Sequence, residues 1–239
     1  MHWKRLRKPR FLFVYPVVVG LFLFAQVSER SFRTGVALVV VGEFVRLWAN
    51  GYVGHVKVNW TQKQRGDSKI GRLITGGPYA LVRHPLYLGT MLVGAGFCLM
   101  VRSAWVSLAA LIGFVSTYSR KMVQEEALLH EEYPQEYARY HAAVPQLLPR
   151  WFRYPNGHGR WTWQGVAASK EWKSVLWICV LTILVYFWEE SVQEHKWLFD
   201  ERPLYRWFLV SVAVLLIVAD GLAELIMRYR QSRDSCFDS

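Results

Sequence analysis

Six long apolar runs, separated by short basic connections, leave this chain few ways to fold. The runs are Phe11–Val27, Thr34–Ala49, Leu86–Val101, Ser103–Tyr118, Val175–Trp188 and Trp207–Ala219. Each is close to the shortest length with which a helix crosses the roughly 30 Å hydrocarbon core of a bilayer. Flanking Trp, Tyr, Lys and Arg residues extend the usable length by lying at the interface. The pattern predicts an all-α integral membrane protein with about six transmembrane helices.

The distribution of basic residues predicts the orientation of these helices. The chain has 29 Lys and Arg against 18 Asp and Glu, a formal net charge of +11. Of the 29, 22 lie in the two termini and in the connections 52–83 and 119–173, and six lie in the other loops. Because loops rich in Lys and Arg stay in the cytoplasm, we expect both termini and both long connections there. Basic charge spread over membrane loops does not require a nucleic-acid partner, and none is expected.

The cysteines and the composition of the chain bound its organisation. Three cysteines, at positions 98, 179 and 236, are too few and too scattered for a disulfide framework or a metal site. No metal is therefore expected. The Gly- and Pro-containing stretch 154–172 has the composition of a connector. We expect a four-span part at residues 1–153 with polar cytoplasmic segments, and the connector with two further spans at residues 154–239.

A polar cluster precedes the third apolar run. The Gly-Gly-Pro sequence at residues 76–78 predicts a turn, and Pro85 suits the first turn of the next helix because it has no backbone N–H. Arg83 and His84 are then expected at the positive end of that helix, on the cytoplasmic rim, where they and backbone N–H groups can bind a carboxylate or phosphate. The alternative is that both residues only mark the headgroup interface.

A second polar cluster follows the fourth apolar run. If that helix continues past Tyr118, Lys121 and Glu125 lie one turn apart on one face. They would form a structural ion pair or hold opposite ends of a zwitterionic ligand. The third and fourth runs are joined only by residues 101–103, so we expect a tight antiparallel hairpin that brings the two clusters together.

Three charged residues within the predicted spans or at the end of one call for partners or a function. Glu43 and Arg46 are three positions apart and favour an intramembrane ion pair. Arg46 is also a candidate for substrate binding. Asp220, at the inner end of the last span, has no obvious local partner and is a candidate for binding a substrate amine.

The two clusters belong to a set of motifs in a fixed order. The motifs are Arg46-Leu47-Trp48-Ala49, Gly77-Pro78-Tyr79, Arg83-His84-Pro85-Leu86-Tyr87-Leu88-Gly89, Glu125-Glu126-Ala127-Leu128-Leu129, Glu136-Tyr137-Ala138-Arg139-Tyr140 and Val144-Pro145-Gln146-Leu147-Leu148-Pro149. Over about residues 34–151 the chain resembles the isoprenylcysteine carboxyl methyltransferase and phospholipid methyltransferase family of integral membrane enzymes.

The resemblance implies a cofactor, a substrate class and a set of site residues. The cofactor would be S-adenosyl-L-methionine in a pocket on the cytoplasmic side, and the partner a lipid or lipidated substrate in the membrane. The implied cofactor-binding residues are Gln64, Gly71, Arg72, Leu73, Ile74, Tyr79, His84, Pro85, Leu86, Tyr87, Glu125 and Glu126. Lys121 stands where the carboxyl methyltransferases have an arginine that contacts the substrate carboxylate, and Lys121 and Arg83 are the catalytic candidates. Lys121 keeps the charge but lacks the bidentate fork of arginine.

Together these features predict an S-adenosyl-L-methionine-dependent methyltransferase. It would be a multi-pass protein of a bacterial inner membrane or of the endoplasmic reticulum membrane, and would methylate an oxygen or a nitrogen of a membrane-embedded lipid or prenylated substrate. Two alternatives stay open. One is an NADPH-dependent membrane reductase of the sterol reductase type, in which Arg-His-Pro-x-Tyr also occurs. The other is a non-catalytic lipid-binding membrane protein.

Overall fold

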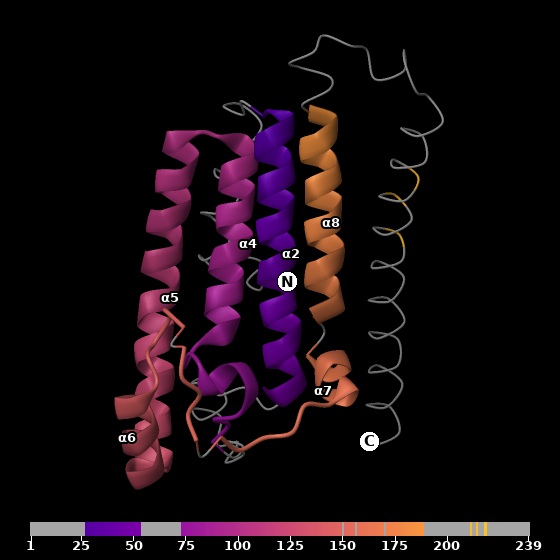
Figure 1. Cartoon of the computed structure of the whole chain (residues 1–239). Coiled ribbons are helices and arrows are strands. Elements are labelled where there is room, and N and C mark those ends of the chain that lie inside the picture. Colours follow the sequence, from indigo (N-terminus) through magenta and orange to yellow (C-terminus); the bar gives the residue numbers. More distant parts are fainter. Residues whose placement is uncertain are drawn as a thin grey trace, which may run out of the picture. The chain divides into compact units, whose positions relative to one another are not determined.

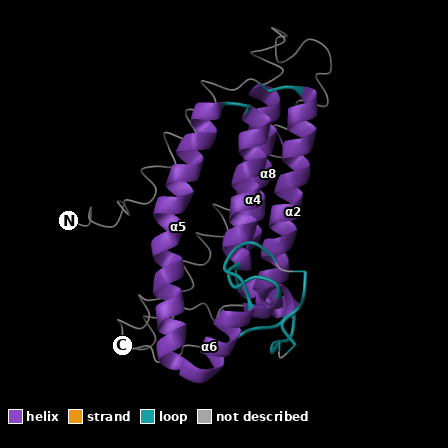
Figure 2. Ribbon diagram, turned by 60° about the vertical axis from the view of Figure 1, so that its left-hand side comes forward, coloured by secondary structure: helices purple, strands orange, loops and turns teal. Residues whose placement is uncertain are grey.

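The structure is a computed structural model that describes residues 27–53, 73–149, 151–155, 157–169 and 171–188, together with positions 211, 214 and 218. The described residues form helices and loops without strands (Figures 1 and 2), which confirms the all-α expectation. The chain divides into two compact units, Met1–Glu171 and Trp172–Ser239. The helices are α2 (Glu29–Val53), η3 (Gly77–Ala80), α4 (Pro85–Val101), α5 (Ala104–Glu132), α6 (Pro134–Ala143), α7 (Trp163–Ala168) and α8 (Glu171–Trp188).

Four of the six predicted spans coincide with helices. The runs that begin at residues 34, 86, 103 and 175 correspond to α2, α4, α5 and α8. The first predicted span, Phe11–Val27, and the last, Trp207–Ala219, lie almost entirely outside the described residues. Among the described helices, α2 alone is long and apolar enough to cross a membrane, and α4 is a shorter apolar helix.

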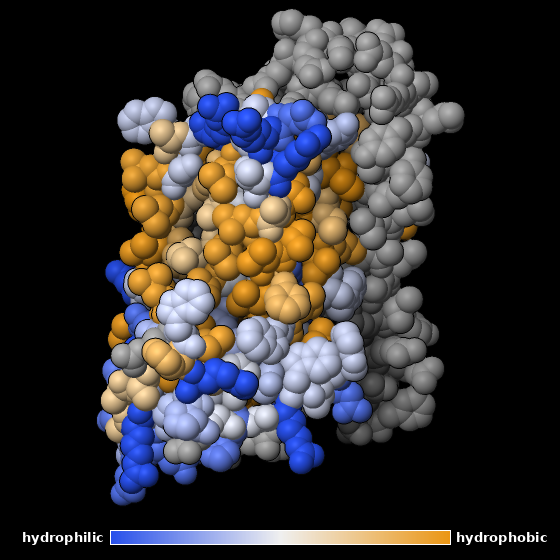
Figure 3. Space-filling view, viewed as in Figure 1, coloured by the Kyte–Doolittle hydropathy of each residue, from blue (hydrophilic) through white to orange (hydrophobic). Residues whose placement is uncertain are grey.

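Large apolar side chains are exposed along α2 and α5. On α2 these are Val40, Val41 and Phe44, and on α5 they are Trp105, Leu108, Leu111, Ile112 and Val115. Figure 3 shows hydrophobic residues as a band across the middle of the visible face, with hydrophilic residues at its two ends. Surfaces of this kind mark contact with a membrane or with another protein.

Two pairs of glycines let α2 and α4 pack backbone against backbone. A Cβ atom added to Gly42 would lie 2.7 Å from the carbonyl oxygen of Gly89, and one added to Gly96 would lie 2.7 Å from that of Gly35. The two pairs run in opposite directions along the helices, so α2 and α4 are antiparallel. Small residues at a helix interface permit this close approach. Gly96 therefore serves helix packing.

The predicted hairpin of the third and fourth runs is confirmed. Arg102 ends α4 in the left-handed conformation, with φ of 51°, and its N–H donates to the Cys98 carbonyl at 3.0 Å. Ser103 then precedes α5, and its carbonyl accepts hydrogen bonds from the Ser107 N–H at 3.0 Å and hydroxyl at 2.9 Å. The following helix α5 continues past Tyr118 to Glu132, which is the condition under which Lys121 and Glu125 share a helix.

The predicted connector lies almost entirely within the first compact unit. The Tyr154 N–H donates to the Ala80 carbonyl at 3.0 Å, and the Thr162 N–H donates to the Gly51 carbonyl at 2.9 Å. The segment also contains the short helix α7, whose first turn is capped by the Thr162 hydroxyl, which accepts from the Gly165 N–H. Residues 154–171 thus belong to the first unit by contact. The functional division at residues 153 and 154 stays a prediction.

Candidate functional site

A cavity of about 300 Å³ lies in the first unit, where residues near the C-terminal end of α2, the N-terminal end of α4 and the middle of α5 meet. This volume is at the lower end of the range for small-molecule sites. The lining residues are Arg46, Val53, Leu73, Ile74, Tyr79, Arg83, His84, Pro85, Leu86, Tyr87, Thr90, Tyr118, Glu125, Leu129, Tyr137, Tyr140 and Glu171. They come from segments far apart in the sequence, as the hairpin expectation required.

Most of the described site candidates lie on this one cavity. The cofactor candidates on its wall are Leu73, Ile74, Tyr79, His84, Pro85, Leu86, Tyr87 and Glu125, and the candidates Arg46 and Arg83 lie there as well. Glu126 and Lys121 do not line the wall but contact residues that do. The remaining candidates, Gln64, Gly71, Arg72 and Asp220, lie outside the described residues.

The N-terminal end of α4 fixes Arg83 and His84. Pro85 is the first residue of the helix, as predicted, and His84 is the residue before it. The N–H of Arg83 donates to the Pro145 carbonyl at 2.8 Å, and the N–H of His84 donates to the Gln146 carbonyl at 3.1 Å. These two backbone donors are therefore used within the protein and are not available to an anionic ligand. The expectation that backbone N–H groups at Arg83 and His84 help to bind a carboxylate or phosphate is therefore wrong for these two groups.

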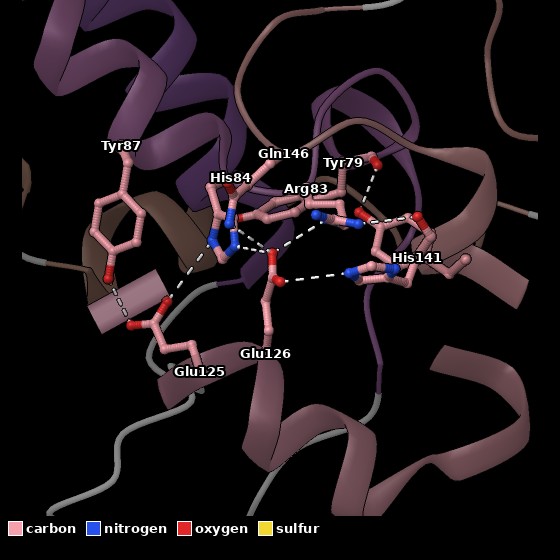
Figure 4. A network of polar contacts seen from close by, with 9 residues as sticks. Tyr79, Arg83, His84, Tyr87, Glu125, Glu126, His141 and Gln146 are labelled. Carbon is pink, nitrogen blue, oxygen red and sulfur yellow. Dashed lines mark hydrogen bonds and ion pairs between the residues drawn. The ribbon is translucent and has the colours of Figure 1, made fainter. Parts of the chain in front are cut away.

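Glu126 is the centre of a polar network behind the cavity wall (Figure 4). Its Oε1 lies 2.9 Å from His84 Nε2, 3.2 Å from Arg83 Nε and 3.2 Å from Gln146 Nε2, which donates to it. Its Oε2 lies 3.5 Å from His141 Nε2. Burial by itself raises the pKa of Glu126, but the hydrogen bond to His84 and the charge of Arg83 outweigh burial and lower that pKa. Glu126 is therefore an ionised group that holds His84 and Arg83 in place.

Glu125 lies on the other side of His84 and faces the cavity. The Tyr87 hydroxyl donates to Glu125 Oε1 at 2.6 Å, and Glu125 Oε2 lies 3.8 Å from His84 Nδ1. The exposed fraction of the Glu125 side chain is 29%, against 15% for Glu126. Of the two neighbouring carboxylates, Glu125 is thus the one that can reach a ligand.

Aromatic rings form one wall of the cavity beside this carboxylate. The Tyr87 ring lies 5.5 Å from the His84 ring and 5.0 Å from the Tyr118 ring, measured between ring centres. The Lys121 ammonium lies 5.0 Å above the Tyr118 ring. Aromatic faces attract cations. A carboxylate beside such rings is suited to a ligand that carries positive charge.

Two tyrosines of α6 close the cavity on another side. The Tyr140 hydroxyl donates to the Tyr79 backbone carbonyl at 2.7 Å, and Tyr137 and Tyr140 are buried in one apolar cluster with Val144. Burial and nearby charged groups raise the pKa of Tyr79, Tyr137 and Tyr140, so their hydroxyls stay protonated at neutral pH. The sequence analysis did not assign Tyr137 and Tyr140 to the site. Their spacing of three positions, which puts them on one face of a helix, was the signal that could have indicated it.

Arg46 lies on the cavity wall in a buried cluster of its own. The predicted ion pair with Glu43 is confirmed, with 2.8 Å between Arg46 Nη1 and Glu43 Oε1. Arg46 Nη2 also pairs closely with Glu171. Asn50 Nδ2 donates to Glu171 Oε2 at 2.9 Å and to the Arg46 carbonyl at 3.0 Å. Sequence reasoning missed Asn50 and Glu171, because no local spacing connects α2 with residue 171.

Comparison with known proteins finds one family model and several relatives that match part of this chain. Residues 30–136 match the profile of the family described as "Phospholipid methyltransferase". A "Cobalt-zinc-cadmium resistance protein CzcN" of Cupriavidus metallidurans is 30% identical over 151 residues, which is 63% of this chain and 62% of that protein. A "Probable protein-S-isoprenylcysteine O-methyltransferase" of Oryza sativa subsp. indica is 28% identical over 53% of this chain and 66% of that protein.

A human relative extends this set. The "Protein-S-isoprenylcysteine O-methyltransferase" of Homo sapiens is 28% identical over 48% of this chain and 40% of that protein. The chain thus spans less than two thirds of the length of these curated relatives. No solved structure matches the chain. The matched segment, residues 30–136, contains α2, α4 and α5 and therefore most of the cavity wall.

Proposed function

We propose that this chain belongs to the family of isoprenylcysteine and phospholipid methyltransferases that it resembles, and that it is an S-adenosyl-L-methionine-dependent methyltransferase of a membrane-embedded lipid or prenylated substrate. The observation that carries the proposal is the position of Glu125. Its carboxylate faces the cavity, is fixed by the Tyr87 hydroxyl, and lies beside the His84 and Tyr87 rings.

The cavity suits the cationic parts of this cofactor. Glu125 would bind the amino group of the methionyl part, because an ionised carboxylate accepts strong hydrogen bonds from an ammonium. Tyr87 and Tyr118 would place their ring faces toward the sulfonium, as aromatic rings do for ligand cations. Leu73, Ile74 and Tyr79 would cover the nucleoside part. Gln64, Gly71 and Arg72, outside the described residues, are proposed to complete this part of the site.

The chemistry requires orientation more than covalent help from the protein. S-adenosyl-L-methionine supplies a methyl group on a positively charged sulfur, which a nucleophile takes by in-line displacement. His84 and Glu125 would orient the donor, while the aromatic wall keeps water from the reacting atoms. Lys121 and Arg83 are the proposed catalytic residues, with Lys121 holding an anionic group of the acceptor. An acceptor carboxylate or phosphate needs no base, whereas an ammonium must first lose a proton.

We place the site at the cytoplasmic face of a multi-pass membrane protein. The positive-inside pattern supports about six spans with both termini in the cytoplasm, in a bacterial inner membrane or the endoplasmic reticulum membrane. The exposed apolar residues of α2 and α5 support lipid contact. A lipid substrate would reach the cavity from the bilayer, with Arg46 and, beyond the described residues, Asp220 as candidates for contacting it.

Ligand titration of the purified full chain in detergent tests the proposal. Calorimetry should show binding of S-adenosyl-L-methionine and none of NADPH. Binding of NADPH alone would favour a reductase of the sterol type, and binding of neither would favour a non-catalytic lipid-binding protein; both results contradict the proposal.

A transfer assay then identifies the acceptor. The full chain is incubated with tritium-labelled S-adenosyl-L-methionine and either a farnesylated cysteine or phosphatidylethanolamine in mixed micelles. Label in the first product indicates a carboxylate acceptor, and label in the second an amine acceptor. Mass spectrometry of total lipids with and without the protein covers other acceptors.

A further inference from the structure

We infer that Glu171, which lies outside the family-matched segment, is a positioning residue for the candidate site and acts by fixing the Arg46 guanidinium on the cavity wall. Glu171 and Arg46 both line the cavity and form a close ion pair. The family match ends at residue 136, so this part of the wall comes from a region that the match does not include. The inference rests on the proposed function insofar as Arg46 contacts the substrate.

The Arg46 guanidinium has carboxylate partners on both of its terminal nitrogens. Nη1 pairs with Glu43 at 2.8 Å, and Nη2 pairs with Glu171. The exposed fractions of the Glu43 and Glu171 side chains are 10% and 6%, against 16% for Arg46. Partners on both terminal nitrogens of a planar group leave it little freedom to rotate. A single partner would hold one nitrogen only.

Asn50 fixes the Glu171 carboxylate in turn. Its side-chain Nδ2 donates to Glu171 Oε2 at 2.9 Å and to the Arg46 carbonyl at 3.0 Å, and the residue is fully buried. The other oxygen of Glu171, Oε1, is the one that pairs with Arg46. Asn50 thus binds one oxygen of the Glu171 carboxylate, and the other oxygen is left for Arg46. Hydrogen bonds of this kind fix the orientation of a side chain that itself holds a group of the site.

The carbon stem of Arg46 is also confined, by the neighbouring helix. A Cβ atom added to Gly89 of α4 would collide with Arg46 Cγ and would lie 3.3 Å from Cδ. The absence of a side chain at Gly89 therefore provides the space that the stem occupies. With the stem held by α4 and the guanidinium held by two carboxylates, Arg46 presents a fixed donor group to the cavity.

The charge of this cluster limits what Arg46 can do. Glu43 and Glu171 both pair with the single guanidinium of Arg46, so its positive charge is offset within the cluster. The cluster is therefore suited to donate directed N–H hydrogen bonds to a polar oxygen of the substrate, and it lacks the excess positive charge that would attract an anion over distance. Removing Glu171 should both loosen Arg46 and take away one negative charge.

Magnetic resonance of Arg46 tests this without any turnover. The full chain is labelled with ¹⁵N-arginine in detergent micelles, and the Arg46 Nε–H signal is assigned from its loss in Arg46→Lys. In Glu171→Gln we expect this signal to shift and broaden, and in Glu171→Asp, which keeps the charge, to stay closer to the parent. The matched control is Glu29→Gln, which removes the exposed Glu29–Arg33 pair of α2, the helix that carries Arg46. An unchanged Arg46 signal in Glu171→Gln would overturn the inference.

Kinetics separate positioning from a merely structural role. With whichever of the two acceptor probes takes the methyl group, Glu171→Gln should raise the KM for that acceptor about tenfold, the effect of one lost charge-assisted hydrogen bond. The Kd for S-adenosyl-L-methionine should stay within about twofold. Equal rises in the KM for the acceptor and in the Kd for S-adenosyl-L-methionine would contradict a positioning role. If Glu171→Gln does not fold, Glu171→Asp must show a smaller change of the same kind. A parent protein without methyl transfer would remove the proposed function, and the Arg46 signal would still test the placement.

Discussion

The Tyr87 hydroxyl of α4 donates a hydrogen bond of 2.6 Å to Glu125 Oε1 of α5, although the two residues are 38 positions apart. The contact depends on the tight turn at Arg102 and on the continuation of α5 beyond Tyr118. It fixes the orientation of a carboxylate that faces the cavity. The second oxygen of Glu125 remains near His84, at 3.8 Å from Nδ1. This pair is therefore the centre of the proposed cofactor site.

Replacing Glu125 with alanine should strongly weaken binding of S-adenosyl-L-methionine. A hydrogen bond to a charged group contributes about 1.5–3 kcal/mol, so the affinity should fall by at least about tenfold. Calorimetric titration of the full chain measures the change. Glu132→Gln, at the exposed end of the same helix, is the control and should bind as the parent does. Unchanged affinity in Glu125→Ala would refute the assignment.

Replacing Tyr87 with phenylalanine should also weaken binding of S-adenosyl-L-methionine, but by less than Glu125→Ala does. The substitution keeps the ring beside Tyr118 and removes only the hydroxyl that holds Glu125. One hydrogen bond contributes about 0.5–1.5 kcal/mol, so we expect roughly a threefold to tenfold rise in Kd. In the double variant Tyr87→Phe/Glu125→Ala the hydroxyl should have no further effect. Additive losses would show that the two residues act independently.

Replacing Lys121 with alanine should lower turnover and leave cofactor affinity unchanged. Its ammonium lies over the Tyr118 ring, and Tyr118 lines the cavity. We expect kcat to fall about tenfold, and Lys121→Arg, which keeps the charge over the ring, to recover part of it. The exposed neighbour Arg120→Ala is the control. Full activity of Lys121→Ala would exclude a catalytic role.

Glu126 should make the fold sensitive to acid. Its pKa in the folded protein is lowered from the ordinary value of 4.5, so its contribution to stability is complete above that value. The contribution is lost as the pH falls from 4.5 through the lowered pKa. Thermal unfolding followed between about pH 6 and about pH 3 should show a steeper loss of stability in the parent than in Glu126→Gln. Parallel curves for the two proteins would contradict this role.

Two glycines in one turn of α4 should respond oppositely to alanine. A Cβ atom at Gly96 would lie 2.7 Å from the Gly35 carbonyl, so Gly96→Ala should destabilise the fold by about 1–3 kcal/mol. A Cβ atom at Gly94 meets no atom within 4 Å, and Gly94→Ala should be neutral or stabilise by up to about 1 kcal/mol. Thermal unfolding of both variants in the same detergent provides the comparison. Equal effects would show that α2 and α4 do not pack through these glycines.

The hairpin and the start of α4 could be predicted because both depend on residues close in sequence. Apolar runs joined by so short a connection can only form a tight antiparallel pair. Pro85 has no N–H and therefore suits the first turn of a helix, where no N–H donor is needed. The short helix α7 was not expected within the connector. Thr162, which caps this helix, is a local signal for a helix start. The Gly and Pro residues of the surrounding stretch nevertheless gave it the composition of a connector.

The separate roles of Glu125 and Glu126 show where local reasoning ends. The two are chemically alike and adjacent, and successive residues on an α-helix point about 100° apart. Which of them faces the cavity depends on how α5 is rotated against α4. The structure turns Glu125 toward Tyr87 and the cavity, and Glu126 toward Arg83, Gln146 and His141.

The sequence alone determined that this chain would form apolar helices, that α4 and α5 would pair, and that residues near His84 and Glu125 would meet. These outcomes follow from the long apolar runs, from turn chemistry and from the short connection between the paired helices. Only the tertiary structure decided that Glu171 would reach Arg46 and that Asn50 would hold it there. That contact joins residues 121 or more positions apart, and no local preference encodes it, because it arises from the burial of charges that stabilise one another once the helices have packed.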